Sequence, residues 1–102
     1  MADKAETSSN AKKFDLSTLE DKLMELDSNA FIEAERECRI AADPTPDIMY
    51  SALFRARLAA KALKVPYEEI SGLKLPEFSA VISRVLVFLL KTLGEEVLQR
   101  NN

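Results

Sequence analysis

The amino-acid sequence predicts an all-α fold: a small helical bundle of about four helices plus a short helical turn, with a long C-terminal helix. Three observations support this class. Apolar residues recur every three to four positions through most of the chain, as they do in amphipathic helices. Prolines and capping residues separate these periodic segments. The 102 residues include only two glycines, a residue type that disfavours helix interiors.

The length and composition are those of one globular domain. The chain is 47% apolar and 30% charged. Residues 1–14 are polar and have no apolar stretch of the kind found in a signal peptide, so we expect a disordered lead-in there. We expect residues 15–99 to form the helical domain and residues 100–102 to be a frayed tail.

The first helix is predicted to begin near Leu16 and to end near Asp27. Ser17 and Glu20 have the spacing of a capping box, in which each side chain accepts a hydrogen bond from a backbone N–H at the start of the helix. Four leucines then recur at helical spacing: Leu16, Leu19, Leu23 and Leu26. These features predict a short amphipathic helix.

The second helix is predicted to run from Ser28 or Asn29 to Ala42. Small and apolar residues form one stripe along it, and charged residues occupy the rest of its surface. The stripe consists of Phe31, Ala34, Cys38 and Ala41. Pro44 ends this helix, because proline disfavours helical geometry at the residue before it.

The third helix is predicted to begin at Thr45 and to run to Leu63 or Lys64. Thr45 is expected to be the N-cap, and Pro46 suits the first helical position. The predicted core face collects Ile48, Met49, Ala52, Leu53, Ala56, Ala59, Ala60 and Leu63. Alanines spaced four residues apart on this face would let a neighbouring helix approach closely.

Two elements remain after the third helix. Val65 and Pro66 interrupt the periodicity, and a short helical turn follows. Gly72 is predicted to end that turn in the left-handed conformation. The last helix is predicted from Pro76 to Gln99, with proline again at the first helical position.

This last helix contains six consecutive apolar residues, Val85 to Leu90. The run is too short for a membrane span, which needs about 20 mostly apolar residues, and it lies between Arg84 and Lys91. On a helix, Glu77, Arg84 and Lys91 form a narrow polar stripe. A wide apolar face lies opposite, formed by Phe78, Val81, Ile82, Val85, Leu86, Leu89, Leu90 and Leu93.

Val87 and Phe88 fall on the two margins of this apolar face, beside the polar stripe. Two interpretations remain open for them. The other helices of the bundle could cover both residues, because apolar patterns usually mark a core. Alternatively, a bundle of short helices leaves part of so wide a face exposed, and that part would bind a partner or a second copy.

The third helix also carries a basic stripe. Tyr50, Arg57, Lys61 and Lys64 follow one another at spacings of seven, four and three residues, and Arg55 lies nearby. Such a face could recognise an acidic segment of another protein. It could equally be a solvated surface paired with the acidic residues of the second helix, since surface charges seldom indicate function.

The residue types argue against an enzyme and against bound cofactors or metals. The sequence has no histidine, the commonest general base and metal ligand at neutral pH. Its single cysteine, Cys38, lies on the apolar stripe and has no histidine to activate it. The net charge of −3 and the pI of about 5.0 disfavour nucleic acid as a partner. One cysteine and no signal peptide are typical of a reducing, cytoplasmic location.

Three stretches of the sequence resemble a family of small tail assembly chaperones, encoded in the tail gene clusters of long-tailed bacteriophages and prophages. They are FIEAERE, ARLAAKALKVPYEEI and PEFSAVISRVLVFLL. The resemblance covers about two thirds of the chain, roughly from Leu23 to Leu90. Two positions depart from the family pattern: Lys64 stands where glycine is usual, and Glu77 replaces the aspartate before Phe78.

The resemblance implies a non-enzymatic protein of the bacterial host cytoplasm. Such chaperones bind the long helical tape-measure protein, recruit tail-tube subunits, and leave before the tail is complete, so the mature virion would lack them. The partner-binding residues that we predict are Tyr50, Arg57, Lys61, Val87, Phe88 and Leu90. The alternative is a homo-oligomeric helical adaptor or regulatory module unrelated to tails.

Overall fold

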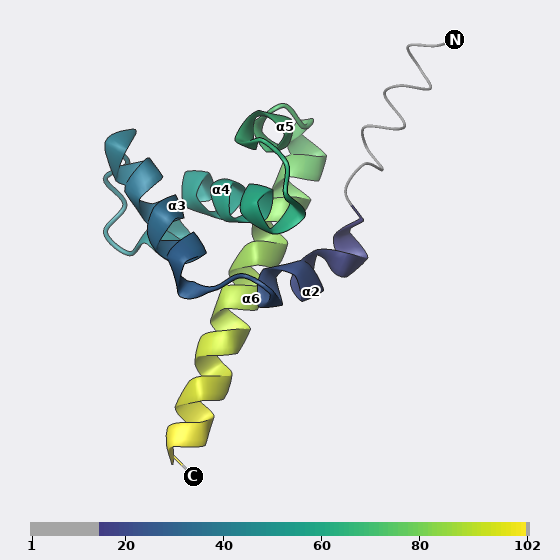
Figure 1. Cartoon of the computed structure of the whole chain (residues 1–102). Coiled ribbons are helices and arrows are strands. Elements are labelled where there is room, and N and C mark those ends of the chain that lie inside the picture. The colour runs from purple at the N-terminus through teal and green to yellow at the C-terminus, as the bar shows by residue number, and fades with distance from the viewer. Residues whose placement is uncertain (1–14, 102) are drawn as a thin grey trace.

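The structure is a computed structural model that describes residues 15–101, and the side chains of residues 15–92. It confirms the all-α class (Figure 1). Five α-helices and two 3-10 turns make up the described part of the chain, and no strand occurs in it. The predicted lead-in, residues 1–14, lies outside the described residues.

The chain begins with a 3-10 turn, η1 (Leu16–Thr18), which leads into α2 (Leu19–Met24). The predicted capping box does not form. Asp15 is the N-cap instead: its carboxylate accepts the N–H of Ser17 at 3.0 Å and the hydroxyl of Ser17 at 2.6 Å. Charged acceptors make the stronger hydrogen bonds, so Asp15 takes the hydroxyl that the capping box would need.

The next helix, α3 (Ser28–Ile40), closely follows the predicted boundaries. Asp27 is its N-cap, because the carboxylate accepts the N–H of Ala30 at 3.2 Å. Ala34 and Cys38 are completely buried, as the predicted stripe requires. Ala41 is exposed, contrary to the prediction. The helix ends at Ile40, so Ala41 no longer shares its periodicity.

The third predicted helix is divided in two. A 3-10 turn, η2 (Ile48–Tyr50), precedes α4 (Ala52–Leu63), and the extended residue Ser51 separates them as the N-cap of α4. The Ser51 hydroxyl accepts the N–H of Phe54 at 3.1 Å. Thr45 is therefore not the N-cap.

The carboxylate of Asp43 explains this difference. It accepts the N–H of Thr45 at 2.9 Å and the Thr45 hydroxyl at 2.6 Å, and it also accepts the Ser51 hydroxyl. These hydrogen bonds lower the pKa of Asp43 to about 2, with the bond from Ser51 the largest cause. Arg39 donates to the carbonyls of Asp43 and Thr45 at 2.9 and 2.8 Å, which fastens this loop to α3.

Helix α4 lies at the centre of the bundle and contacts α2, α3, α5 and α6. Its buried residues are Phe54, Ala56, Leu58, Ala59, Ala60 and Ala62. Because neighbours pack on several sides, burial is not confined to the one face that the sequence predicted. Ala52 was assigned to the core but is exposed, since the break at Ser51 places it in the first turn of the helix.

A short helix, α5 (Tyr67–Ser71), confirms the predicted turn but not its ending. Gly72 has φ −85°, in the right-handed region. A Cβ at this position would lie 3.0 Å from the carbonyl oxygen of Glu68, so close packing explains the glycine. The left-handed residues are Lys64, with φ 60°, and Ala42, with φ 67°, which follow the ends of α4 and α3.

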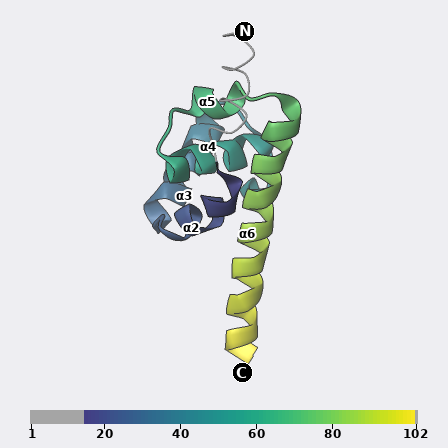
Figure 2. The ribbon, with the colours of Figure 1, turned by 90° about the vertical axis from the view of Figure 1, so that its right-hand side faces the viewer.

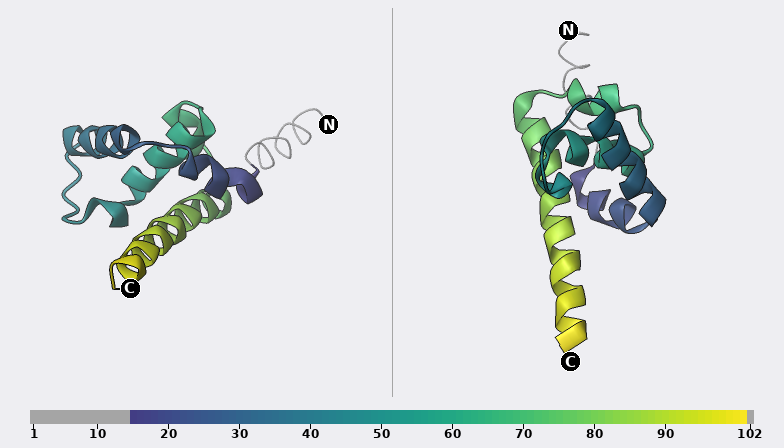
Figure 3. Two further views of the ribbon diagram at one scale, coloured as in Figure 1. Left: turned by 60° about the horizontal axis from the view of Figure 1, so that its bottom comes forward. Right: turned by 90° about the vertical axis from the view of Figure 1, so that its left-hand side faces the viewer.

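The last helix, α6 (Leu75–Asn101), is the longest. Its N-terminal half packs against the other helices, and its C-terminal part projects from the body (Figures 1 and 2). Two further directions of view show the same projection (Figure 3). The helix continues two residues beyond the predicted end at Gln99. One core cluster joins α2, α3, η2, α4, α5 and α6.

Replacing Lys64 by glycine is expected to raise the free energy of unfolding by up to about 1 kcal/mol. A side chain in the left-handed region costs roughly 1–2 kcal/mol, and the flexibility of glycine in the unfolded chain offsets part of this gain. Urea unfolding measures the change. Arg36→Gly, within α3, is the control and should lower the stability by about 1 kcal/mol; a loss at both positions would contradict the left-handed assignment.

Candidate protein-binding surface

The side of α6 that faces away from the core is partly apolar. Val81 and Val85 are buried in the core cluster, with exposed fractions of 1% and 0%. Val87 is 63% exposed and Leu90 is 43% exposed. Two residues along a helix correspond to a rotation of about 200°, so Val87 lies nearly opposite Val85. We call Val87 and Leu90 the α6 flank.

Phe88 behaves differently from its neighbours. It is half-buried and packs against the core cluster. Each of the two interpretations of the apolar margins of α6 therefore holds for one residue. The bundle partly covers Phe88, and it leaves Val87 exposed. Phe88 also contributes to two grooves, both of which are lined by residues of α2 and α6.

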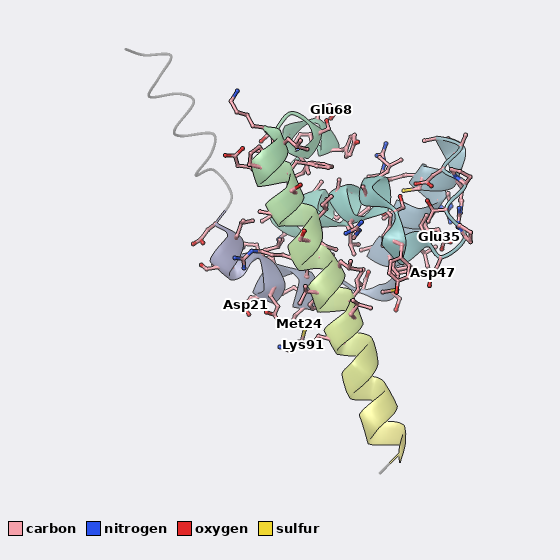
Figure 4. The ribbon with its side chains drawn as sticks, turned by 180° about the vertical axis from the view of Figure 1, so that it is seen from behind. Asp21, Met24, Glu35, Asp47, Glu68 and Lys91 are labelled. Atoms are coloured by element: carbon pink, nitrogen blue, oxygen red, sulfur yellow. The ribbon has the colours of Figure 1, made fainter. Side chains whose placement is uncertain are left out.

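The larger groove lies between α2, α3 and α6, and we call it the α2–α3–α6 groove. Its volume is about 590 Å³. The apolar residues that line it are Leu23, Met24, Leu26, Phe31, Ile32, Leu58, Phe88 and Leu89, and the polar ones are Asp27, Ser28 and Thr92. Met24 and Ile32 are 66% and 50% exposed. Met24 and Lys91, labelled in Figure 4, mark the level at which α6 leaves the body.

The smaller groove, of about 420 Å³, lies between α6 and the η1–α2 segment, and we call it the α2–α6 groove. Arg84 and Lys91 line it together with Val87, Phe88 and Glu20. Arg84 donates to the carbonyl of Leu16 at 3.5 Å, and Lys91 forms an ion pair with Glu20 at 3.2 Å. Intramolecular bonds therefore hold both basic side chains.

The predicted basic stripe of the third helix is not an open basic face. Arg57 forms an ion pair with Glu37 at 3.5 Å and lies over the ring of Tyr67, 4.3 Å from its centroid. Lys61 forms ion pairs with Glu33 at 3.5 Å and Glu37 at 3.3 Å. Arg57 and Lys61 thus join α3, α4 and α5, as the interpretation of a solvated, paired surface required.

The six predicted binding residues do not form one surface. Val87, Phe88 and Leu90 lie together on α6. Arg57 and Lys61 line a separate groove of about 380 Å³, to which α3, α4 and α5 contribute and α6 does not. Tyr50 is 53% exposed but belongs to η2, and the extended residue Ser51 places it out of register with α4.

Sequence reasoning missed the groove residues Met24 and Ile32. Neither belonged to a predicted apolar stripe, and no role was assigned to either. The sequence does contain one indication of these two residues: each is a large apolar residue outside the apolar stripe of its own helix. Ile40, which is 79% exposed, gives the same signal and lines none of the three grooves described here. The pattern alone therefore does not distinguish a groove residue from an isolated one.

The described residues offer few groups suited to chemistry. Cys38 is completely buried, and burial raises the pKa of its thiol. Among the described side chains, no three His, Cys, Asp or Glu residues lie in a group that could hold a metal ion. Within the same part of the chain, no helix is both long and apolar enough to cross a membrane.

Comparison of the chain with protein-family models, with curated proteins and with solved structures finds no match. The geometry of the grooves and of α6, together with the resemblance in sequence, therefore indicates the kind of partner that this chain suits.

Proposed function

We propose that this chain is a non-enzymatic phage tail assembly chaperone that binds helical segments of other proteins. The observation that carries the proposal is the α6 flank: Val87 and Leu90 are exposed on a helix that projects from the body, and Val87 also lines the α2–α6 groove. Exposed apolar surface next to a groove is the usual feature of a site that binds an amphipathic helix.

The sequence resemblance supplies the identity of the partners. The tape-measure protein is long and helical, and it would be kept soluble in the host cytoplasm by chaperones bound along it. Tail-tube subunits would then be recruited, and the chaperone would leave as they assemble. The chaperone could leave only if its affinity for the tape-measure protein were modest, and a small interface on each copy is consistent with modest affinity.

A co-purification experiment tests this proposal. The full chain would be co-expressed with a tape-measure fragment and with the tail-tube protein of the same gene cluster. The double variant Val87→Asp, Leu90→Asp is expected to retain roughly tenfold less fragment than the wild type, because burying an unpaired carboxylate in an apolar interface costs more than the about 1.4 kcal/mol that corresponds to a tenfold change in affinity. Circular dichroism should show an unchanged helical spectrum, since both residues are exposed.

Ile40→Asp is the matched control. It makes one substitution of the same kind at an exposed apolar residue of α3 that lines none of the described grooves, and it should co-purify as the wild type does. Equal retention by the double variant would remove the α6 flank from the binding site. A stable dimer in light scattering, without affinity for either tail protein, would instead favour the homo-oligomeric adaptor.

A further inference from the structure

The α2–α3–α6 groove is an open apolar trough between three helices. Eight of its eleven lining residues are apolar. Leu23 and Leu58 form part of its buried wall, and the exposed side chains of Met24 and Ile32 stand at its opening. The polar groups that line it are few, as in grooves that take the apolar face of a helix.

The charge around this groove is predominantly negative. Asp27 is the one charged residue among those that line it. The part of the chain that forms one wall, residues 23–27, contains two acidic residues and no basic one, a formal charge of −2. The acidic residues are Glu25 and Asp27. Lys91, which lies near this wall, is held in an ion pair by Glu20.

We infer that the α2–α3–α6 groove binds an amphipathic helix of another protein, with large aliphatic residues on one face and Lys or Arg beside them. This inference depends on the proposed helix-binding function and adds a binding site separate from the α6 flank, whose residues do not line this groove, together with the chemistry of its partner. The apolar stripe would contact Ile32, Met24 and Phe88. The basic residues would lie against the acidic α2 wall, where opposite charges favour association.

A second copy of this chain suits the groove less well. The helix that a second copy could offer is the projecting end of α6, residues 93–101, which contains Glu95, Glu96 and a single basic residue, Arg100. A net negative helix against the acidic α2 wall would bring like charges together, which disfavours binding. Charge complementarity therefore favours a basic partner over self-association.

Two synthetic helical peptides test the inference. Both carry the same leucine stripe, and their flanking positions are lysine in one and glutamate in the other. Binding to the full chain is measured by fluorescence anisotropy. The lysine peptide is expected to bind roughly tenfold more tightly than the glutamate peptide, and the difference should shrink at high salt because salt screens surface charges.

Substitutions on α3 locate the binding site. Ile32→Asn places an uncharged polar group at the opening of the groove and is expected to weaken the lysine peptide roughly tenfold. Ile40→Asn makes the same change at an exposed residue outside the groove and should leave the affinity unchanged. Circular dichroism of both variants shows whether α3 is intact.

Several outcomes would overturn the inference. Equal affinity for the two peptides would show that charge plays no role in binding. Unchanged affinity of Ile32→Asn for the lysine peptide would show that the peptide binds outside the groove. A wild-type dimer that Ile32→Asn converts to a monomer would show that a second copy occupies the groove.

The experiments also distinguish failure of the groove proposal from failure of the chaperone proposal. If the chain retains a tape-measure fragment but binds neither peptide, the groove assignment fails alone. If it binds the lysine peptide but no tail protein, the chaperone proposal fails alone.

Discussion

Replacing Phe54 by alanine is expected to lower the free energy of unfolding by about 3–5 kcal/mol, the usual cost of removing a buried phenylalanine ring. Phe54 is completely buried in α4. Its ring contacts that of Phe31 edge to face, with centroids 4.8 Å apart and planes at 65°. Because α4 contacts four other helices, the cavity would lie where the bundle has least freedom to collapse.

Urea unfolding, followed by circular dichroism, measures this loss. Native domains are stable by only about 5–15 kcal/mol, so the variant should unfold at a much lower urea concentration or fail to fold at all. Tyr50→Ala removes a half-exposed ring four residues earlier in the chain and is the matched control, expected to cost less than about 1 kcal/mol. Similar losses in the two variants would contradict the central position assigned to Phe54.

Replacing Ser51 by alanine is expected to lower the free energy of unfolding by about 1–2 kcal/mol. Ser51 is only 4% exposed. Its hydroxyl accepts the N–H of Phe54 at the start of α4 and donates to the carboxylate of Asp43, so the substitution removes both bonds. Ser71→Ala is the control: this exposed hydroxyl donates to the carbonyl of Glu68 at 3.3 Å, and its loss should change the stability by no more than about 0.5 kcal/mol.

The effect of Ser51→Ala should depend on pH. The folded state lowers the pKa of Asp43 from 3.8 to about 2, so this carboxylate stabilises the fold fully above its ordinary pKa and loses that contribution as the pH falls toward the lowered value. Without the Ser51 hydroxyl, the pKa of Asp43 should return toward 3.8. The difference in stability between variant and wild type should therefore narrow as the pH falls through this window.

Unfolding curves recorded from about pH 5 to about pH 2 measure this narrowing. Direct titration of the Asp43 carboxyl by nuclear magnetic resonance gives the pKa in each protein. An unchanged pKa in Ser51→Ala would show that the bonds from Thr45, and not the bond from Ser51, dominate the environment of Asp43.

The long helices were predictable because their apolar periodicity agrees with their packing. The predicted limits of α3 and α6 differ from the observed ones by only one or two residues. The predicted start of the third helix was wrong. Thr45 and Pro46 have the local features of a helix start, but the Asp43 carboxylate accepts hydrogen bonds from Thr45 and Ser51. That competition depends on a bond between residues eight apart in the chain, which local spacing does not indicate.

The candidate site shows the same distinction between features that depend on one helix and contacts that depend on how two helices pack. The angular position of Val87 placed it at a margin of the apolar face, but Phe88 at the other margin packs against the core while Val87 is exposed, so the sequence left both interpretations open. The ion pairs of Arg57 and Lys61 depend on how α3 lies across α4, which no pattern within one helix specifies. A consequence is that charge reversal at Arg57 and Lys61 would weaken the contacts between helices and would not test binding to a partner.

The buried position of Cys38 has a consequence for the proposed chaperone function, in which many copies would bind one partner. The thiolate is the form that attacks a disulfide, and burial raises the pKa of this thiol and keeps it from contact with solvent. Folded copies crowded along one long partner should therefore not become covalently linked to one another or to it. Every contact that they make could then still be broken at the step at which the proposed chaperone would leave.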